Sequence, residues 1–304
     1  MSRGSVELVD IADRDLPEAK AFLERNPDTS LFLLSNIRAF GTRLGDSLYS
    51  GNLRGLRQND ALRAVFCLTR SGSLLAQTGG CAEFAPEILE ACAREAIAIR
   101  GVIGEWRITK AIWDLLVAAK KLRPTFVSKE ISYRFDETKP LPPMATAFHI
   151  RLLNETDHEQ WDELAVAFQR ESGLPAPGTR DQRKSAFIRS VGLHHWWGAF
   201  EDDRLVSLAA IIAMHETMAQ IGSVFTPPEH RRRGLSRAVM TKLMRDARLD
   251  QQLDKLFLFT GEENAPARRL YESLGFESFG HFGLFFGENT TDTEEVRSRP
   301  RKSV

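Results

Sequence analysis

Cysteine, long apolar runs and net charge are all scarce in this sequence of 304 residues, and each scarcity excludes a class of protein. The three cysteines, Cys67, Cys81 and Cys92, are odd in number and lack the C-x-x-C spacing of zinc and redox sites. We expect them to be buried thiols in a reducing cytoplasm. No segment approaches the roughly 20 apolar residues of a membrane-spanning helix, and acidic residues precede any apolar run of signal length. A soluble, cytoplasmic protein with no membrane partner is expected.

The charge balance argues against a nucleic-acid partner. Lys plus Arg and Asp plus Glu number 41 each, so the chain has no overall basic field. An RNA-associated protein that uses the arginines of residues 231–233 would need further basic surface, which the neutral total does not supply. With 42% hydrophobic residues, the chain is long enough for two modest globular domains.

A proline-rich stretch predicts the domain boundary. KPLPPMATA, residues 139–147, interrupts the hydrophobic pattern as linkers do. The polar C-terminal tail is expected to be disordered. The predicted parts are a first domain over 1–138, the linker over 139–147, a second domain over 148–288 and the tail over 289–304.

The hydrophobic periodicity predicts one order of elements in both halves. In the first half, strands are expected at 6–11, 62–70, 73–79, 101–108 and 126–135, and helices at 15–25, 30–40, 86–97 and 110–120. In the second half, strands are expected at 148–153, 218–226 and 255–260, a hairpin at 194–214, helices at 157–168, 232–249 and 265–274, and a closing strand pair at 276–286. The shared order suggests an internal duplication; the alternative is a coincidence between two α+β domains.

The stretch IGSVFTPPEHRRRGLSRAVM, residues 221–240, predicts a strand, a turn at a proline pair and an amphipathic helix. The first N–H groups of a helix have no partner within it, and the helix dipole adds partial positive charge there, so a pyrophosphate fits this end. Gly234 and the small Ser236 allow the backbone to approach such an anion closely. Fixed positive charge comes from Arg231, Arg232 and Arg233. The turn is therefore a candidate cradle for a nucleotide-like anion.

Arg231, Gly234 and Ser236 in RRRGLS resemble the signature of the GNAT acetyltransferase superfamily, Arg/Gln-x-x-Gly-x-Gly/Ala. Ser236 departs from the last position: serine is small enough for close approach, but its side chain adds bulk beside the diphosphate. The resemblance implies acetyl-CoA, or another acyl-CoA, as co-substrate and no metal. Together with the duplication it implies an α+β chain of tandem GNAT-like folds, each a mixed, mostly antiparallel sheet flanked by helices.

A second segment, NAPARRLYESLGF at 264–276, resembles the GNAT pattern Asn-x-x-Ala-x-x-Leu-Tyr-x-x-x-Gly-Phe one strand downstream. Taken alone, Tyr271 reads as a core aromatic residue, because it shares a helix face with Ala267 and Leu274. The resemblance instead directs its hydroxyl at the sulfur of coenzyme A and lets Asn264 bond the pantetheine arm. The residues expected to contact the cofactor are Val224, Phe225, Thr226, Arg231, Arg232, Arg233, Gly234, Leu235, Ser236, Asn264, Ala267 and Tyr271.

The resemblance also implies a direct reaction in which an amine attacks the thioester within a ternary complex. Tyr271 is the expected general acid for the departing thiolate. A backbone N–H of residues 222–225 is expected to stabilise the oxyanion, and residues 224–226 to pair with pantetheine amides as a strand would.

The general base is open, because the strand MAQIGSVFT carries no carboxylate where many family members have a glutamate. Glu216, Glu171 and His215 are the candidates, each with the alternative of an exposed loop residue. The sequence His194-His195-Trp196-Trp197 invites a metal-site interpretation. Adjacent residues on a strand point to opposite faces, however, so strand packing is the preferred interpretation.

The first half lacks the corresponding motifs. Its equivalent turn, GCAEFAPEILEA, has no arginine and places Glu83 and Glu87 where a pyrophosphate would bind. We therefore interpret it as a degenerate GNAT-like domain without a cofactor of its own, which shapes the acceptor pocket, stabilises the partner domain or makes a dimer contact.

A degraded first half with TPPEHRRRGLS in the second is similar to the FR47-like branch of the superfamily, which includes amino-acid N-acyltransferases. An amino acid or other small amine is therefore the leading acceptor, and a protein N-terminus or lysine is next. The opposing hypothesis is a non-catalytic acyl-CoA-binding regulator or scaffold. Acceptor loops are expected over 172–190, and the chain is expected to be a monomer or a homodimer.

Overall fold

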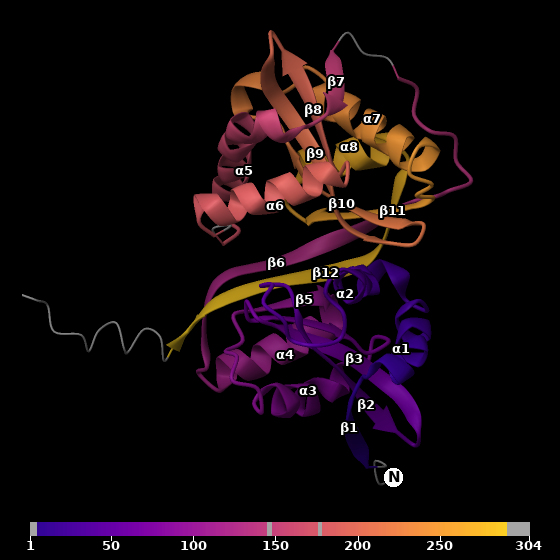
Figure 1. Cartoon of the computed structure of the whole chain (residues 1–304), viewed down its shortest axis with the longest axis vertical. Coiled ribbons are helices and arrows are strands. Elements are labelled where there is room, and N and C mark those ends of the chain that lie inside the picture. Colours follow the sequence, from indigo (N-terminus) through magenta and orange to yellow (C-terminus); the bar gives the residue numbers. More distant parts are fainter. Residues whose placement is uncertain (1–4, 145–147, 176–177, 291–304) are drawn as a thin grey trace, which may run out of the picture. The chain divides into compact units, whose positions relative to one another are not determined.

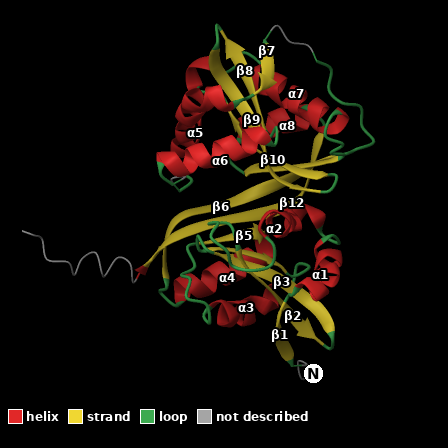
Figure 2. Ribbon diagram, in the orientation of Figure 1, coloured by secondary structure: helices red, strands yellow, loops and turns green. Residues whose placement is uncertain are grey.

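Two units with the same order of elements make up the chain in this computed structural model, which describes residues 5–144, 148–175 and 178–290 (Figure 1). Grouped by contacts, one unit comprises Met1–Glu130 with His281–Val304, and the other comprises Ile131–Gly280. Both units combine helices with a sheet, as Figure 2 shows. The predicted internal duplication matches this repeated order.

The first half of the chain contributes six strands and four α-helices. Its strands are β1 (Val6–Asp10), β2 (Gly51–Gln58), β3 (Ala61–Thr69), β4 (Ser73–Gln77), β5 (Gly101–Glu105) and β6 (Leu122–Phe135). Its helices are α1 (Leu16–Leu23), α2 (Pro27–Phe40), α3 (Ala85–Cys92) and α4 (Trp106–Ala118).

The second half repeats that inventory. Its strands are β7 (His149–Leu152), β8 (Trp196–Glu201), β9 (Arg204–His215), β10 (Met218–Phe225), β11 (Lys255–Gly261) and β12 (Phe276–Asn289). Its helices are α5 (His158–Ser172), α6 (Arg180–Gly192), α7 (Leu235–Leu249) and α8 (Ala265–Ser273).

Each unit orders its strands in the same way. In the first unit the order β1-β2-β3-β4-β5 continues into β12, and in the second the order β7-β8-β9-β10-β11 continues into β6. The pairs β4–β5 and β10–β11 are parallel, and the pairs β1–β2, β2–β3, β3–β4, β5–β12, β7–β8, β8–β9 and β9–β10 are antiparallel. The predicted mixed, mostly antiparallel sheet flanked by helices is confirmed for both units.

The contact-based division does not follow the predicted linker at 139–147. It falls within β6 and β12, because each of these 14-residue strands is long enough to contribute residues to both units. Residues 140–144 have no regular structure, whereas 145–147 lie outside the described residues. Of the predicted tail over 289–304, only the first two residues are described.

Hydrophobic side chains form a core on each face of the second unit's sheet. One core gathers residues of α7 and α8 against the strands, including the fully buried Val239 and Leu243. The other gathers residues of α5 and α6, including Trp161 and Phe187, whose rings stack at 4.5 Å. Alternate residues of β9 enter the two cores: Val206 packs in the first, and Leu205 in the second. This two-sided burial fixes the strands that carry the site described below.

Several elements were missed or predicted with the wrong extent or kind. The strand expected at 101–108 ends at Glu105, and the helix expected at 110–120 begins at Trp106. The strand Gly51–Gln58 was missed, because its glycines and arginines do not read as a strand; a Cβ at Gly51 would lie 2.3 Å from the backbone oxygen of Leu68, so close strand packing requires the glycine. The helix expected at 86–97 ends at Cys92. The strand pair expected at 276–286 is the single strand β12.

A further correction concerns the predicted acceptor loop at 172–190, much of which is helical. Helix α6 begins after Thr179, whose hydroxyl accepts a hydrogen bond from the backbone N–H of Gln182 while the Gln182 side chain accepts one from the Thr179 N–H. This capping box, T-x-x-Q, was the overlooked signal. In the part of the chain that is described, no helix combines the length and apolarity needed to cross a membrane.

Candidate active site

The turn between β10 and α7 has the backbone form of an anion-binding helix start. A short 3-10 turn, Pro228–His230, follows β10, and α7 begins at Leu235. Gly234 precedes the helix with φ of +84°, a left-handed conformation that glycine adopts without strain. A Cβ on Gly234 would meet no described atom within 4 Å, so this backbone borders open space. The first N–H groups of α7 are thereby accessible to an anion.

A cavity of about 930 Å³ borders this turn and reaches α8. It lies in the size range of small-molecule sites. Eleven of the twelve residues predicted to contact the cofactor line it: Val224, Phe225, Thr226, Arg231, Arg232, Gly234, Leu235, Ser236, Asn264, Ala267 and Tyr271. Two predicted motifs, separated by a strand in the sequence, thus share one cavity.

The twelfth predicted residue, Arg233, is not among the lining residues. Its guanidinium forms two hydrogen bonds with the Glu201 carboxylate, one of them at 2.9 Å, at the polar turn between β8 and β9. The cavity nevertheless has an excess of cations, because four arginines and one carboxylate line it. Arg237 and Arg269 are two of these arginines, and the sequence analysis missed both. Their positions in the first turn of α7 and on α8 were the available signal.

Arg231 joins the cradle to the end of α5. Its Nε donates a hydrogen bond to the backbone oxygen of Thr226 at 2.8 Å, and its Nη2 lies 2.6 Å from both carboxylate oxygens of Glu171. Both side chains are partly exposed, at 40% for Arg231 and 49% for Glu171. Glu171, a predicted base candidate, thus lies in the cavity but is engaged by the guanidinium that faces the cradle.

Three hydroxyl groups form a hydrogen-bonded row beneath the cradle. The Ser236 and Thr226 hydroxyls share a hydrogen bond of 2.7 Å, and those of Thr226 and Ser207 share another of 2.7 Å. Ser207 also donates to the backbone oxygen of Phe225 at 3.1 Å. The Ser236 hydroxyl, at the position where the sequence departs from the family signature, is therefore held against β10.

Strands β10 and β11 part at the cavity. Their parallel pairing covers only Met218–Gln220 against Lys255–Phe257, although both strands continue. Beyond that point β10 carries a bulge: Gly222 faces Ala210 and Phe225 faces Leu208 on β9, so one extra residue is accommodated on β10. Ser223 within the bulge has φ of +51°. The bulge turns backbone groups of residues 222–225 out of the regular ladder, next to the cavity.

Tyr271 is buried on α8 and lines the cavity, with an exposed fraction of 6%. Its ring packs edge-on against Tyr133, at 6.1 Å between centroids, and against Phe276 at 6.3 Å. Asn264 begins the same helix, and its side-chain oxygen accepts a hydrogen bond from the Ala267 N–H at 3.2 Å. This cap orients α8 and thereby the tyrosine.

The other base candidates lie elsewhere. Glu216 is in the turn before β10, with φ of +49° and a side chain 70% exposed, and His215 is buried at the end of β9 with Nε2 4.0 Å from the Glu216 carboxylate. Neither lines the cavity. Since a strand rises about 3.3 Å per residue, the eight residues of β10 separate them from the cradle by roughly 25 Å. His230, in contrast, lines the cavity and was not considered from the sequence.

The two tryptophans of the HHWW segment pack in the two cores. Trp197 is fully buried and donates from Nε1 to the Asp246 carboxylate at 2.8 Å. Trp196 packs on the other face and donates from Nε1 to the Ser190 hydroxyl at 2.9 Å. The packing interpretation of these aromatic residues fits this arrangement.

The equivalent region of the first unit is closed. β4 and β5 pair in parallel from Ser73 against Gly101 to Ala76 against Gly104, almost the full length of both strands. The Gln77 side chain fills the turn that follows: its oxygen accepts from the Gly79 N–H at 2.8 Å. Its amide nitrogen donates to Thr29 and Ser30, at 2.7 and 3.1 Å. A cofactor has no parted strand pair to enter here.

Comparisons with known proteins agree with this geometry. Residues 154–276 match the family model described as Acetyltransferase (GNAT) family. The uncharacterized N-acetyltransferase YsnE of Bacillus subtilis is 32% identical over 93 residues, which are 29% of this chain and 61% of that protein. Human N-acetyltransferase 8 is 29% identical over 90 residues, 28% of this chain and 39% of that protein. The matches thus span less than two thirds of these relatives.

A solved structure extends the likeness to both units. The GCN5-related N-acetyltransferase from Sphaerobacter thermophilus aligns with 92% of this chain and 94% of its own, at a TM-score of 0.61 and 15% identity, which establishes similarity of fold. The sequence match to the GNAT acetyltransferase family thus covers one part of this chain, and the solved structure adds a similarity of fold. Residues 154–276, which carry the parted strands and the cradle, are the part that the family model matches.

Proposed function

We propose that this chain is an N-acyltransferase that moves an acetyl or short acyl group from acyl-CoA to a primary amine, with a small molecule or an amino acid as acceptor. The observation that carries the proposal is the single cavity that joins the cradle of α7 to Tyr271 on α8. A regulator that only binds acyl-CoA would need the cradle and could dispense with the tyrosine. Cys67 and Cys92 are buried, as predicted, whereas Cys81 is only partly buried; the free thiols are compatible with the proposed cytoplasmic location.

The lining residues fit coenzyme A. The accessible start of α7 and the surplus of arginines suit a pyrophosphate, and Gly234 leaves room for its close approach. The parted strands leave β10 without a partner on its β11 side beyond Gln220, where the amides of a pantetheine arm could pair with its backbone near Val224. When bound, the acyl thioester supplies the activated carbonyl carbon that an amine attacks.

The residues of this chain then have separate tasks. A backbone N–H within the bulge at 222–225 stabilises negative charge on the carbonyl oxygen. Tyr271 donates its hydroxyl proton to the departing thiolate, and Asn264 holds the helix that carries it. We assign no side chain as general base, because Glu171 is paired with Arg231 and Glu216 lies outside the cavity. The attacking amine then loses its proton to water, and Tyr271 regains one from water.

Replacement of Tyr271 by phenylalanine tests the assignment. We expect Tyr271→Phe to leave the Kd for coenzyme A within twofold and to lower kcat by about 100-fold, the usual scale of general acid catalysis. The assay follows free thiol released from acetyl-CoA in the presence of small amines and amino acids. The matched control is Tyr133→Phe, which removes a buried hydroxyl that donates to Glu272 and does not line the cavity.

The outcomes separate the candidate functions. Full turnover by Tyr271→Phe would remove this residue as the acid. If thiol is released only with peptides that offer an N-terminus or a lysine, the acceptor is a protein rather than a small molecule. Saturable acyl-CoA binding without thiol release from any amine would support the regulator.

A further inference from the structure

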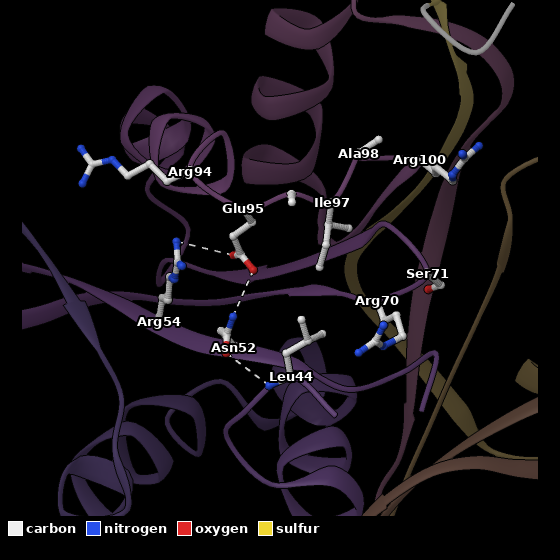
Figure 3. A pocket seen from close by; sticks show the side chains of 11 residues that line it. Leu44, Asn52, Arg54, Arg70, Ser71, Arg94, Glu95, Ile97, Ala98 and Arg100 are labelled. Carbon is white, nitrogen blue, oxygen red and sulfur yellow. Dashed lines mark hydrogen bonds and ion pairs between the residues drawn. The ribbon is translucent and has the colours of Figure 1, made fainter. Parts of the chain in front are cut away.

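A cavity of about 500 Å³ lies in the first unit, away from the turn that corresponds to the cradle. It borders the connection between the C-terminal end of α3 and β5, whereas the closed turn lies at the N-terminal end of α3. β2 contributes Asn52 and Arg54, the turn after β3 contributes Arg70, and the connection contributes Glu95 and Ile97 (Figure 3). The cavity is therefore not a remnant of an acyl-CoA site.

A buried carboxylate with unused hydrogen-bonding capacity faces this cavity. The Glu95 side chain is only 5% exposed. Its Oε2 accepts a hydrogen bond from Asn52 Nδ2 at 3.3 Å, and Asn52 in turn accepts one from the Leu44 N–H at 3.2 Å. Its Oε1 has no hydrogen-bond partner among the described residues and lies 3.5 Å from Arg54 Nη1. A buried carboxylate oxygen without a hydrogen-bond donor favours a ligand that supplies an N–H group.

The charge of Arg54 is already shared. Its guanidinium donates to the Ala91 backbone oxygen at 2.9 Å and lies 3.5 Å from both Asp10 and Glu95. Because the two carboxylates surround a single cation, the buried end of the cavity has no surplus of positive charge. This end suits an ammonium group rather than an anion.

The opposite side of the cavity is cationic. Arg70 is exposed and donates from Nε to the Gly45 backbone oxygen at 2.6 Å, and among the described residues it forms no ion pair with a carboxylate. Figure 3 shows Arg70 beside Leu44 and Ser71, across from Glu95, whereas Arg94 points outward. Arg94 is paired with Glu90 at 2.7 Å on the surface. Arg70 is thus a lining arginine that is available to a ligand carboxylate.

Aliphatic groups line the cavity beside these two ends. The remaining lining includes Leu44, Ala96, Ile97 and Ala98. A ligand that satisfies all three features carries an ammonium group, a carboxylate and an apolar side chain. We propose that this cavity binds an aliphatic α-amino acid, with the ammonium group on Glu95 and the carboxylate on Arg70.

Calorimetric titration of the full chain with L-leucine, without acyl-CoA, tests the proposal. We expect one saturable site per chain and at least tenfold weaker binding of isoamylamine, which lacks the carboxylate, and of 4-methylpentanoate, which lacks the ammonium group. Glu95→Gln and Arg70→Ala should each weaken leucine binding at least tenfold, because each removes one charged contact. Arg94→Gln is the matched control and should bind leucine as the wild type does.

Two variants show whether a change in leucine binding comes from this cavity, rather than from misfolding or from the cavity of the second unit. Arg70 is exposed, so Arg70→Ala tests the site even if Glu95→Gln fails to fold, which a thermal melt would reveal. Arg231→Glu, at the separate cavity of the second unit, should leave leucine binding unchanged. No leucine binding to the wild type, equal binding of the three probes, or unchanged binding by Arg70→Ala would overturn the proposal.

Discussion

The ion pair between Glu171 and Arg231 predicts that the Glu171→Gln variant binds coenzyme A more tightly than the wild-type protein does. Arg231 borders the cradle, and its Nη2 is held by both oxygens of Glu171. An incoming pyrophosphate must therefore compete with a carboxylate for this guanidinium. Glu171→Gln keeps the size of the side chain and removes its charge, so we expect tighter binding.

The exposure of the pair sets the size of the effect. Both side chains are more than one third exposed, so water screens the interaction, and such surface pairs contribute about 0.5–1 kcal/mol. Since 1.4 kcal/mol corresponds to a factor of ten, loss of the competition should lower the Kd for coenzyme A by about two- to fivefold. The gain should shrink at high salt.

Calorimetric titration with coenzyme A at low and high salt measures this change. Glu163→Gln is the matched control, because Glu163 is an exposed carboxylate on the same helix that does not line the cavity. Unchanged or weaker binding by Glu171→Gln would refute the competition. Unchanged binding together with a large loss of kcat would instead make Glu171 the general base.

Three further predictions concern the cradle, the thiols and α6. Ser236→Ala should leave coenzyme A affinity within threefold, because the Ser236 hydroxyl is turned toward Thr226; a calorimetric loss above tenfold would show that it contacts the ligand instead. Burial raises the pKa values of Cys67 and Cys92 to about 12, so both stay protonated at pH 8 and should resist iodoacetamide in the folded protein, which mass spectrometry of labelled peptides checks. Rapid labelling of either would contradict their burial. Thr179→Ala should lower the free energy of unfolding by about 1 kcal/mol in urea titrations, whereas Thr179→Ser should retain most of it; equal stability of all three proteins would exclude the cap.

The sequence located the residues of the candidate cavity better than it located the ends of the helices and strands. The motif residues around Gly234 and Tyr271 could be found because a close backbone approach and a helix cap demand particular residue types at fixed spacing. The pairing of Arg231 with Glu171 joins residues 60 positions apart, and nothing local indicates it. The bulge at Ser223 could not be predicted either, because a serine in the sequence does not indicate a positive φ.

The strand β12 illustrates a different limit. A strand pair was predicted at 276–286, yet residues from Phe276 to Asn289 form one strand, which pairs with β5 of the first unit. That pairing depends on a partner strand some 180 residues earlier in the chain, which periodicity cannot reveal. The first unit's buried Glu95 was overlooked for the same reason, because its partners Asn52 and Arg54 come from a strand that was missed.

Calorimetric titration with acetyl-CoA of the wild type, Arg231→Glu and Arg233→Glu tests most directly whether the cradle binds the donor. The two variants make the same charge reversal at neighbouring positions, but only Arg231 lines the cavity. We expect one site per wild-type chain, at least tenfold weaker binding by Arg231→Glu and less than threefold weaker binding by Arg233→Glu. No binding by the wild type, or equal affinity of Arg231→Glu and the wild type, would contradict the cradle and with it the proposed transferase.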